Sequence, residues 1–369
     1  MKFSFSLPLA ANISRRDDSD SADVPLQCSG YNLVLADTGH ISHVMLEERD
    51  EDDELAALYA EAVSKARASA PKGAHIGAVL GSEDCSAEEY DCGAFEAAVF
   101  DYLEKMTILR DEGAELILLH GCSRLWQMRA GVIAAVQAEI PVFVTVNADE
   151  DGKSENEIDY IAALITLQSL GASAFGIRST DGIGELPELL EIALPHAEIP
   201  LIAVADLSSL DKDSLKKLSY SGASVFINTA PDKDGATAER LLSCQNIFDP
   251  ESEKDSYAAA VESEVFFLPD NIELSQPIEC DYSMSDELID MDDENINSIC
   301  IVLHSSDDVS LLAVNSNMSR LPVTVHASDA TTLEAALRYF TGRLIVDSRC
   351  PIERRELEAL CARYGGIVY

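Results

Sequence analysis

Two side chains that can do chemistry follow one apolar segment of the chain. His120 and Cys122 come directly after Leu116–Leu119. An imidazole can act as a general base or a metal ligand, and a thiolate can act as a nucleophile or a soft metal ligand. Cys122 is therefore the candidate catalytic residue. The alternative is a buried structural thiol, which is the usual place of a free cysteine, and we favour it because no Cys-x-x-Cys pair supports metal binding.

Polar residues also end other apolar segments on the side where His120 lies. They are Asn147, Arg178 and Asn228. If the segments are parallel strands of a barrel, these side chains converge on one mouth, where Arg178 can hold a carboxylate through two hydrogen bonds and the amides can orient it. The alternative, given equal weight, is that Arg178 pairs with nearby acids, namely Asp181, Glu185 or Asp206.

The segments that must position these residues carry two strand signatures. A Gly-Ala pair or an apolar-Pro pair precedes each short apolar run, in alternation along the chain. Gly ends the preceding helix, and Pro is tolerated at the first position of a strand. The strands predicted in this way are Leu116–Leu119, Val142–Val146, Ala174–Ile177, Leu201–Val204 and Val225–Ile227.

The stretches between these strands have helical spacing, so each strand begins one β/α unit. Weaker apolar runs at Phe3–Leu9, Leu33–Leu35 and Ile76–Leu80 bring the count to about eight strands. We predict an α/β protein with a TIM-type (β/α)8 barrel over residues 1–248. An open doubly wound sheet is the alternative, because periodicity does not report closure.

The rest of the chain is shorter and less regular. Residues 249–261 begin with Asp249–Ser256, which is polar and contains Pro, so we predict an acidic linker. Residues 262–369 contain strand and helix patterns for a truncated second β/α module. An incomplete sheet leaves an edge through which the module could associate with itself or with a partner protein.

The chain carries 66 acidic and 26 basic residues in 369, a formal charge of −40. This charge argues against binding to nucleic acid or to anionic membranes. The nine cysteines form an odd set without metal-binding spacing, which favours reduced thiols and a cytoplasmic location. The acidic tracts Glu47–Glu54 and Asp286–Glu294 lack the spacing of a calcium loop, and Asp149–Asp151 before Gly152 is typical of a solvated turn.

Several of these segments together resemble the homocysteine S-methyltransferase superfamily. The strand and acidic turn Val142–Gly152, the helix Ile158–Leu170 and the strand Gly171–Ile177 resemble the middle of its barrel. Residues 321–368 resemble the opening of the pterin-binding barrel that follows it in cobalamin-dependent methionine synthases. The resemblance covers most of the chain, in the domain order of that family.

The resemblance implies three zinc-binding cysteines that favour the thiolate of homocysteine. At the corresponding places this sequence has Ser179, Thr229 and Ala230, none of which is a good zinc ligand. We therefore expect no metal site, and we add Ser179 and Thr229 to the predicted ligand-binding residues. In the second module, the polar residues that would face a pterin fall near His304, His326 and Asp347.

We predict a divergent methyltransferase-like protein, a degenerate enzyme that binds a small carboxylate or amino-acid-like molecule at the barrel mouth or supports a methyl-transfer system. No cofactor is expected; zinc, cobalamin or folate would follow only if the family activity is retained. One alternative is an active S-methyltransferase with ligands re-sited to Cys122 and His120. The other is a non-enzymatic interaction subunit that acts through residues 262–369.

Overall fold

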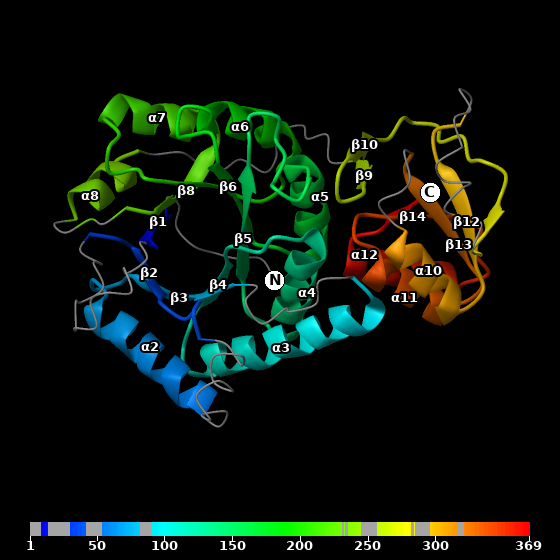
Figure 1. Ribbon diagram of the computed structural model, residues 1–369, viewed down its shortest axis with the longest axis horizontal. Coiled ribbons are helices and arrows are strands. Elements are labelled where there is room, and N and C mark those ends of the chain that lie inside the picture. The colour runs from blue at the N-terminus through cyan, green and yellow to red at the C-terminus, as the bar shows by residue number, and fades with distance from the viewer. Residues whose placement is uncertain are drawn as a thin grey trace.

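Parallel strands alternate with helices through the first two-thirds of the chain. The computed structural model describes residues 9–13, 30–41, 54–81, 90–230, 232, 235–244, 257–281, 284, 296–315 and 321–369. Eight parallel strands form one sheet with helices around it (Figure 1). The two strands at the ends of the sheet order, the first and the second in the chain, contact each other. This is the predicted (β/α)8 barrel, and the open-sheet alternative is wrong.

The strands and helices of the barrel follow each other in regular order. The strands are β1 (Leu9–Asn12), β2 (Leu33–Ala36), β3 (His75–Leu80), β4 (Leu116–Leu119), β5 (Val142–Ala148), β6 (Ala174–Ser179), β7 (Leu201–Ala205) and β8 (Ala223–Asn228). The helices are α2 (Leu55–Ser69), α3 (Cys92–Asp111), α4 (Leu125–Gln137), α5 (Tyr160–Leu170), α6 (Leu186–Ala193), α7 (Lys212–Tyr220) and α8 (Ala236–Leu242). A 3₁₀ turn, η2 (Leu194–His196), follows α6.

Alternate residues of the strands fill the barrel interior. Leu35, Leu116, Phe143 and Ile202 belong to one buried cluster inside it, whereas the residues between them pack against the helices. The interior is crowded: a Cβ built on Gly176 would lie 2.6 Å from a methyl group of Thr145 and 3.2 Å from Ile202. Glycine is therefore needed at this position for the strands to close around the core.

The barrel has a seam between β1 and β2. Each strand pairs with its neighbours from β2 through β8 to β1, but no backbone ladder joins β1 to β2 within the described residues. A side chain bridges the seam instead, because the backbone N–H of Ala10 donates to Oδ1 of Asn32 at 2.8 Å.

A second unit follows the barrel. Its five strands are all parallel and follow chain order across the sheet. They are β11 (Ile278–Glu279), β12 (Ile299–Leu303), β13 (Val323–Ala327), β14 (Ile345–Val346) and β15 (Ile367–Val368). Its helices α10 (Ser306–Val314), α11 (Ala330–Tyr339) and α12 (Arg354–Tyr364) pack on one face.

The other face of this sheet is covered by the segment that leaves the barrel. This segment forms an antiparallel hairpin of β9 (Ala258–Ala260) and β10 (Val265–Phe267). Ala259 and Ile272 pack with Ile345 and Ile367 of the sheet. Residues 258–260 thus form a strand inside the predicted 249–261 linker, while residues 249–256 lie outside the described part of the chain, and the domain boundaries stay a prediction.

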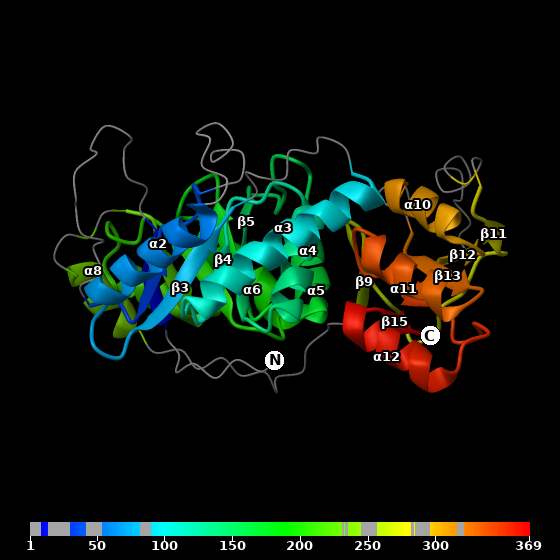
Figure 2. The same cartoon turned by 90° about the horizontal axis from the view of Figure 1, so that it is seen from below.

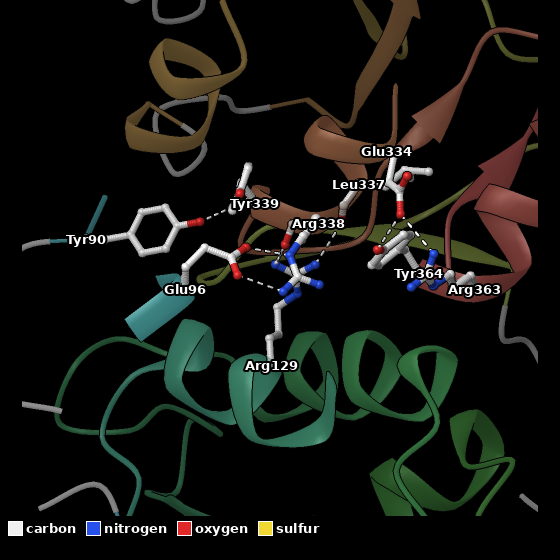
Figure 3. A network of polar contacts seen from close by, with 9 residues as sticks. All are labelled: Tyr90, Glu96, Arg129, Glu334, Leu337, Arg338, Tyr339, Arg363 and Tyr364. Atoms are coloured by element: carbon white, nitrogen blue, oxygen red, sulfur yellow. Dashed lines mark hydrogen bonds and ion pairs between the residues drawn. The ribbon is translucent and has the colours of Figure 1, made fainter. Parts of the chain in front are cut away.

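The second unit packs against the barrel helices α3, α4 and α5, as two perpendicular views show (Figures 1 and 2). This contact explains why eleven consecutive residues of α4, from Leu125 to Ala135, are buried. A helix that is covered on all sides is apolar all round. Arg129 is the charged exception, and it points from α4 toward the end of α11 (Figure 3).

The acidic tracts 47–53 and 286–294 and the first residues of the predicted strand Phe3–Leu9 lie outside the described residues. Among the helices that the structure describes, none has both the length and the apolar character required to cross a bilayer.

Candidate ligand-binding site at the barrel mouth

The mouth of the barrel lies at the carboxyl ends of its strands, where active sites of this fold are found. His120 directly follows β4, and Asn147 and Arg178 lie near the ends of β5 and β6. These residues continue the alternation of Leu116, Phe143 and the other interior side chains. Because successive strand side chains point to opposite faces, all three point toward the barrel axis. The structure therefore brings these predicted residues to adjacent strands of one mouth.

His120 is held in place by a hydrogen bond across two strands. Its Nδ1 lies 2.8 Å from Oγ1 of Thr145. The same hydroxyl lies 3.2 Å from the carbonyl oxygen of Leu119, so Thr145 connects the imidazole to the end of β4. Thr145 was missed by the sequence analysis, although its place between Phe143 and Asn147 on the inward face could have indicated it.

Arg178 and Asn147 are neighbours at the rim. They are paired positions of the parallel ladder between β5 and β6, and both are exposed. The guanidinium of Arg178 has no ion pair with a described residue. Two of the acids proposed to pair with it are engaged elsewhere: Asp181 accepts the N–H of Glu150 at 2.8 Å, and Asp206 accepts that of Ser208 at 3.1 Å. Arg178 is thus available to an anion.

Cys122 lies beneath this rim and not in it. Its side chain is 8% exposed and belongs to the core between sheet and helices. Burial raises the pKa of the thiol to about 11, and the nearby hydroxyl of Tyr102, 3.7 Å from Sγ, offsets this only in part. The thiol is therefore protonated at neutral pH, which disfavours a role as nucleophile or metal ligand.

Asn228 faces the helices, away from the mouth. It is fully buried; its Oδ1 accepts the N–H of Leu207 at 3.0 Å, and its Nδ2 donates to the carbonyl of Ala230 at 2.9 Å. Nδ2 also lies 3.2 Å from the hydroxyl of Tyr31. These hydrogen bonds fix the loop after β8, so the side chain of Asn228 stabilises the structure of that loop. Its predicted contact with a ligand stays a prediction.

The hydroxyl of Tyr31 continues this network to Asp232. It donates to Oδ2 of Asp232 at 3.0 Å, and the carboxylate also accepts the N–H of Ala238 in the first turn of α8 at 3.3 Å. Burial raises the pKa of Tyr31 to about 12, so its hydroxyl remains a donor at physiological pH. Nothing in the sequence pattern signalled Tyr31 or Asp232, because their contacts join distant segments.

Ser179 ends β6, and Thr229 directly follows β8. The hydroxyl of Ser179 is buried and has no hydrogen-bond partner among the described residues. Thr229 is half-buried, and its backbone N–H donates to the carbonyl of Ala205 at 2.9 Å. The acidic turn after β5 folds on itself: Asp149 Oδ1 accepts the N–H of Asp151 at 3.0 Å and that of Lys153 at 2.8 Å, as predicted for a solvated turn.

The fold and the mouth together define a β/α-barrel protein with a polar site at the carboxyl ends of its strands. Residues 28–238 match the family model described as homocysteine S-methyltransferase, which covers more than half of the 369 residues. The chain belongs to the homocysteine S-methyltransferase family.

Two relatives and one solved structure are similar to parts of this chain. The methionine synthase of Mycobacterium leprae is 31% identical over 106 residues, 27% of this chain and 9% of that protein. The methionine synthase of Mycobacterium tuberculosis is 31% identical over 131 residues, 33% of this chain and 11% of that protein. The metallated homocysteine methyltransferase MmuM of Escherichia coli is 15% identical, with 58% of this chain and 80% of that chain covered and a TM-score of 0.49. The matched stretches thus span about a tenth of the curated relatives.

The positions implied for zinc ligands do not fit that metal. Ser179 and Thr229 offer neutral hydroxyls, and Ala230 offers a backbone carbonyl that already accepts from Asn12 at 2.7 Å. Zinc in proteins prefers thiolate, imidazole or carboxylate ligands. In the part of the chain that the structure describes, no three His, Cys, Asp or Glu side chains are grouped closely enough to hold a metal ion.

Proposed function

We propose that this family member binds a small carboxylate or amino-acid-like molecule at the barrel mouth and does not activate a thiol through zinc at Ser179, Thr229 and Ala230. The observation that carries the proposal is the exposed Arg178 on the inward face of β6, without an ion pair in the described structure. An arginine in this position matches the two oxygens of a carboxylate.

Two neighbours support recognition of the rest of such a molecule. Asn147 on β5 presents an amide that can donate to or accept from a polar group next to the carboxylate. His120 is fixed at the mouth by the contact of its Nδ1 with Thr145. An imidazole at this position can exchange a hydrogen bond with a polar group of the ligand. Arg178, Asn147 and His120 together suit a short amino acid: the guanidinium is complementary to its carboxylate, and the amide and imidazole can bind its ammonium group.

The test is calorimetric titration of the purified chain with L-methionine and reduced L-homocysteine, and with L-methioninol, which lacks the carboxylate. We expect the amino acids to bind and the alcohol to bind at least about tenfold more weakly, because hydrogen bonds to a charged group are strong. Arg178→Gln should weaken binding of the amino acids by a similar factor. Equal binding of methionine and methioninol, or an unchanged Arg178→Gln variant, would contradict the proposal.

Arg354→Gln provides a matched control. Arg354 is an exposed arginine on α12, where it forms an ion pair with Glu358 of the same helix, so its loss should leave binding unchanged. Metal analysis of the same preparation tests the second half of the proposal. One tightly held zinc per chain would refute it, and would favour an active S-methyltransferase with re-sited ligands.

A further inference from the structure

The hairpin of the second unit reaches the loops that carry the barrel mouth. The turn between β9 and β10 is closed by the N–H of Val261, which donates to the carbonyl of Glu264 at 3.0 Å. Between them, Glu262 contacts two different barrel loops: the loop from β4 to α4, which begins at His120, and the loop from β5 to α5, which begins at Asp149.

The first contact is at the N-terminus of α4. The residue before this helix is Arg124, whose side chain gives no capping hydrogen bond. The carboxylate of Glu262 takes this role from outside the barrel: its Oε1 accepts the N–H of Leu125 at 2.9 Å. Glu262 is only 8% exposed. A carboxylate at this end also interacts favourably with the helix dipole, so the two effects act together.

The second contact is at the N-terminus of α5. The carbonyl of Glu262 accepts the N–H of Asp159, the capping residue of α5, at 3.0 Å. Lys153 reinforces this junction, because its Nζ contacts the carbonyl of Ser263 and Oδ2 of Asp159, the latter at 3.1 Å. Asn156 then joins the two loops by donating to the carbonyl of Ser123 at 3.0 Å.

The hairpin is itself firmly attached to the second unit. Ala260 and Arg343 exchange two backbone hydrogen bonds, of 3.2 and 2.8 Å. A Cβ on Gly342 would lie 1.8 Å from the carbonyl oxygen of Ala260, so the backbones touch. In the opposite direction, Arg129 of α4 donates to the carbonyls of Leu337 and Arg338 at the end of α11, at 3.0 and 3.2 Å (Figure 3). Each unit thus caps a helix of the other.

From these contacts we infer that Glu262 is a positioning residue of the barrel-mouth site and that the second unit is required for the mouth to hold its ligand. The inference rests on the proposed function. Glu262 sets the first turn of α4 and the entry to α5, and these set the loops whose first residues include His120 and Asp149. Loss of its carboxylate releases the loop between His120 and Leu125 while the barrel strands stay intact.

The chain contains a reporter for this turn. Trp126 is the only tryptophan of the protein; it follows Leu125, is 4% exposed, and its ring lies 5.7 Å from that of Tyr90. Its emission therefore responds to the first turn of α4. Hydrogen exchange of the Leu125 amide reports the same turn independently of any ligand.

The experiment compares Glu262→Ala, Glu262→Gln and Glu264→Ala in the full chain. We expect Glu262→Ala to shift Trp126 emission to longer wavelength, to speed exchange in peptides covering residues 121–126 by roughly fivefold, and to weaken L-methionine binding by a similar factor, with unchanged circular dichroism. Glu262→Gln keeps an acceptor oxygen and should recover part of each effect. Glu264 is exposed in the same turn, so Glu264→Ala should behave as the unaltered chain.

The outcomes separate the two proposals. If the unaltered chain binds none of the probes, the proposed function fails, and fluorescence and exchange still decide whether Glu262 holds the loops. If exchange and emission of Glu262→Ala equal those of Glu264→Ala, the inference is refuted even when L-methionine binds. Changed exchange with unchanged methionine affinity would also refute it, because Glu262 would then support the helix without positioning the site.

Discussion

At Cys122, burial and the hydroxyl of Tyr102 act on the thiol in opposite directions, and burial prevails, with a pKa of about 11. We predict that iodoacetamide leaves Cys122 unmodified in the folded chain at mildly alkaline pH, since the thiolate is the reactive form. Peptide mass spectrometry, with the chain in urea as control, measures this. Rapid modification of folded Cys122 would instead favour an active enzyme with re-sited ligands.

The individual site residues were predictable from sequence to different degrees. His120, Asn147 and Arg178 were found because each ends a strand with a clear apolar pattern, and they do share one mouth. Asn228 ends its strand with equal clarity but faces the helices. Val225 and Ile227 of β8 point into the barrel, so the next residue, Asn228, points outward. Tyr31 and Glu262 lie far along the chain from their partners, so no local pattern could reveal them.

In the second unit, a buried carboxylate, that of Asp347, directly follows β14. Asp347 is 4% exposed and accepts hydrogen bonds from Nε of Arg349 at 2.8 Å and Nδ1 of His326 at 3.0 Å. Burial alone would raise the pKa of Asp347, but the hydrogen bonds, with Arg349 foremost, hold this pKa below its ordinary value. A carboxyl with a lowered folded pKa stabilises the fold above its unfolded pKa, and this stabilisation is lost as pH falls.

We therefore predict that Asp347→Asn lowers the free energy of unfolding by about 1–3 kcal/mol at neutral pH, because charge-assisted hydrogen bonds are lost. The difference from the unaltered chain should narrow as the pH is lowered toward about 3. Urea unfolding followed by circular dichroism across this pH range measures both. Asp270→Asn, at an exposed position, should change little. A difference that is constant with pH would contradict the assignment.

Most strands and helices follow from the sequence because their patterns are local. The five strands predicted from the Gly-Ala and apolar-Pro signatures match β4 to β8. Residues 258–260, which form β9, fell within the predicted linker, since three consecutive alanines have low strand propensity. They form a strand by pairing with β10, and Ala260 also bridges to Arg343, a contact that no local pattern encodes.

For the whole molecule, the reciprocal capping predicts that barrel and second unit unfold together. Arg129 is completely buried, and burial lowers the pKa of its guanidinium to about 10, which leaves it charged at neutral pH. We predict one calorimetric transition for the unaltered chain. Arg129→Met should lower the free energy of unfolding by about 1–3 kcal/mol, because two carbonyls of α11 lose their donor, and should separate the transition into two.

Arg124→Met is the matched control, because it removes the same charge from the exposed start of the same helix. Its calorimetric trace should retain a single transition near that of the unaltered chain. Two transitions in the unaltered chain, or equal traces for both variants, would mean that Arg129 does not couple the units. The bidentate pair of Arg338 with Glu96, at 2.5 and 2.9 Å, would then be the stronger connection.

The side chain of Asn32 stands where a row of strand-to-strand bonds would otherwise close the barrel. The eight-stranded sheet curves so that its two edge strands, β1 and β2, lie next to each other. Among the described residues, separation of β1 from β2 breaks no backbone ladder, but it breaks the hydrogen bond from Ala10 to Asn32. β1 is therefore held by a backbone ladder on one side, that with β8, and by a side chain on the other.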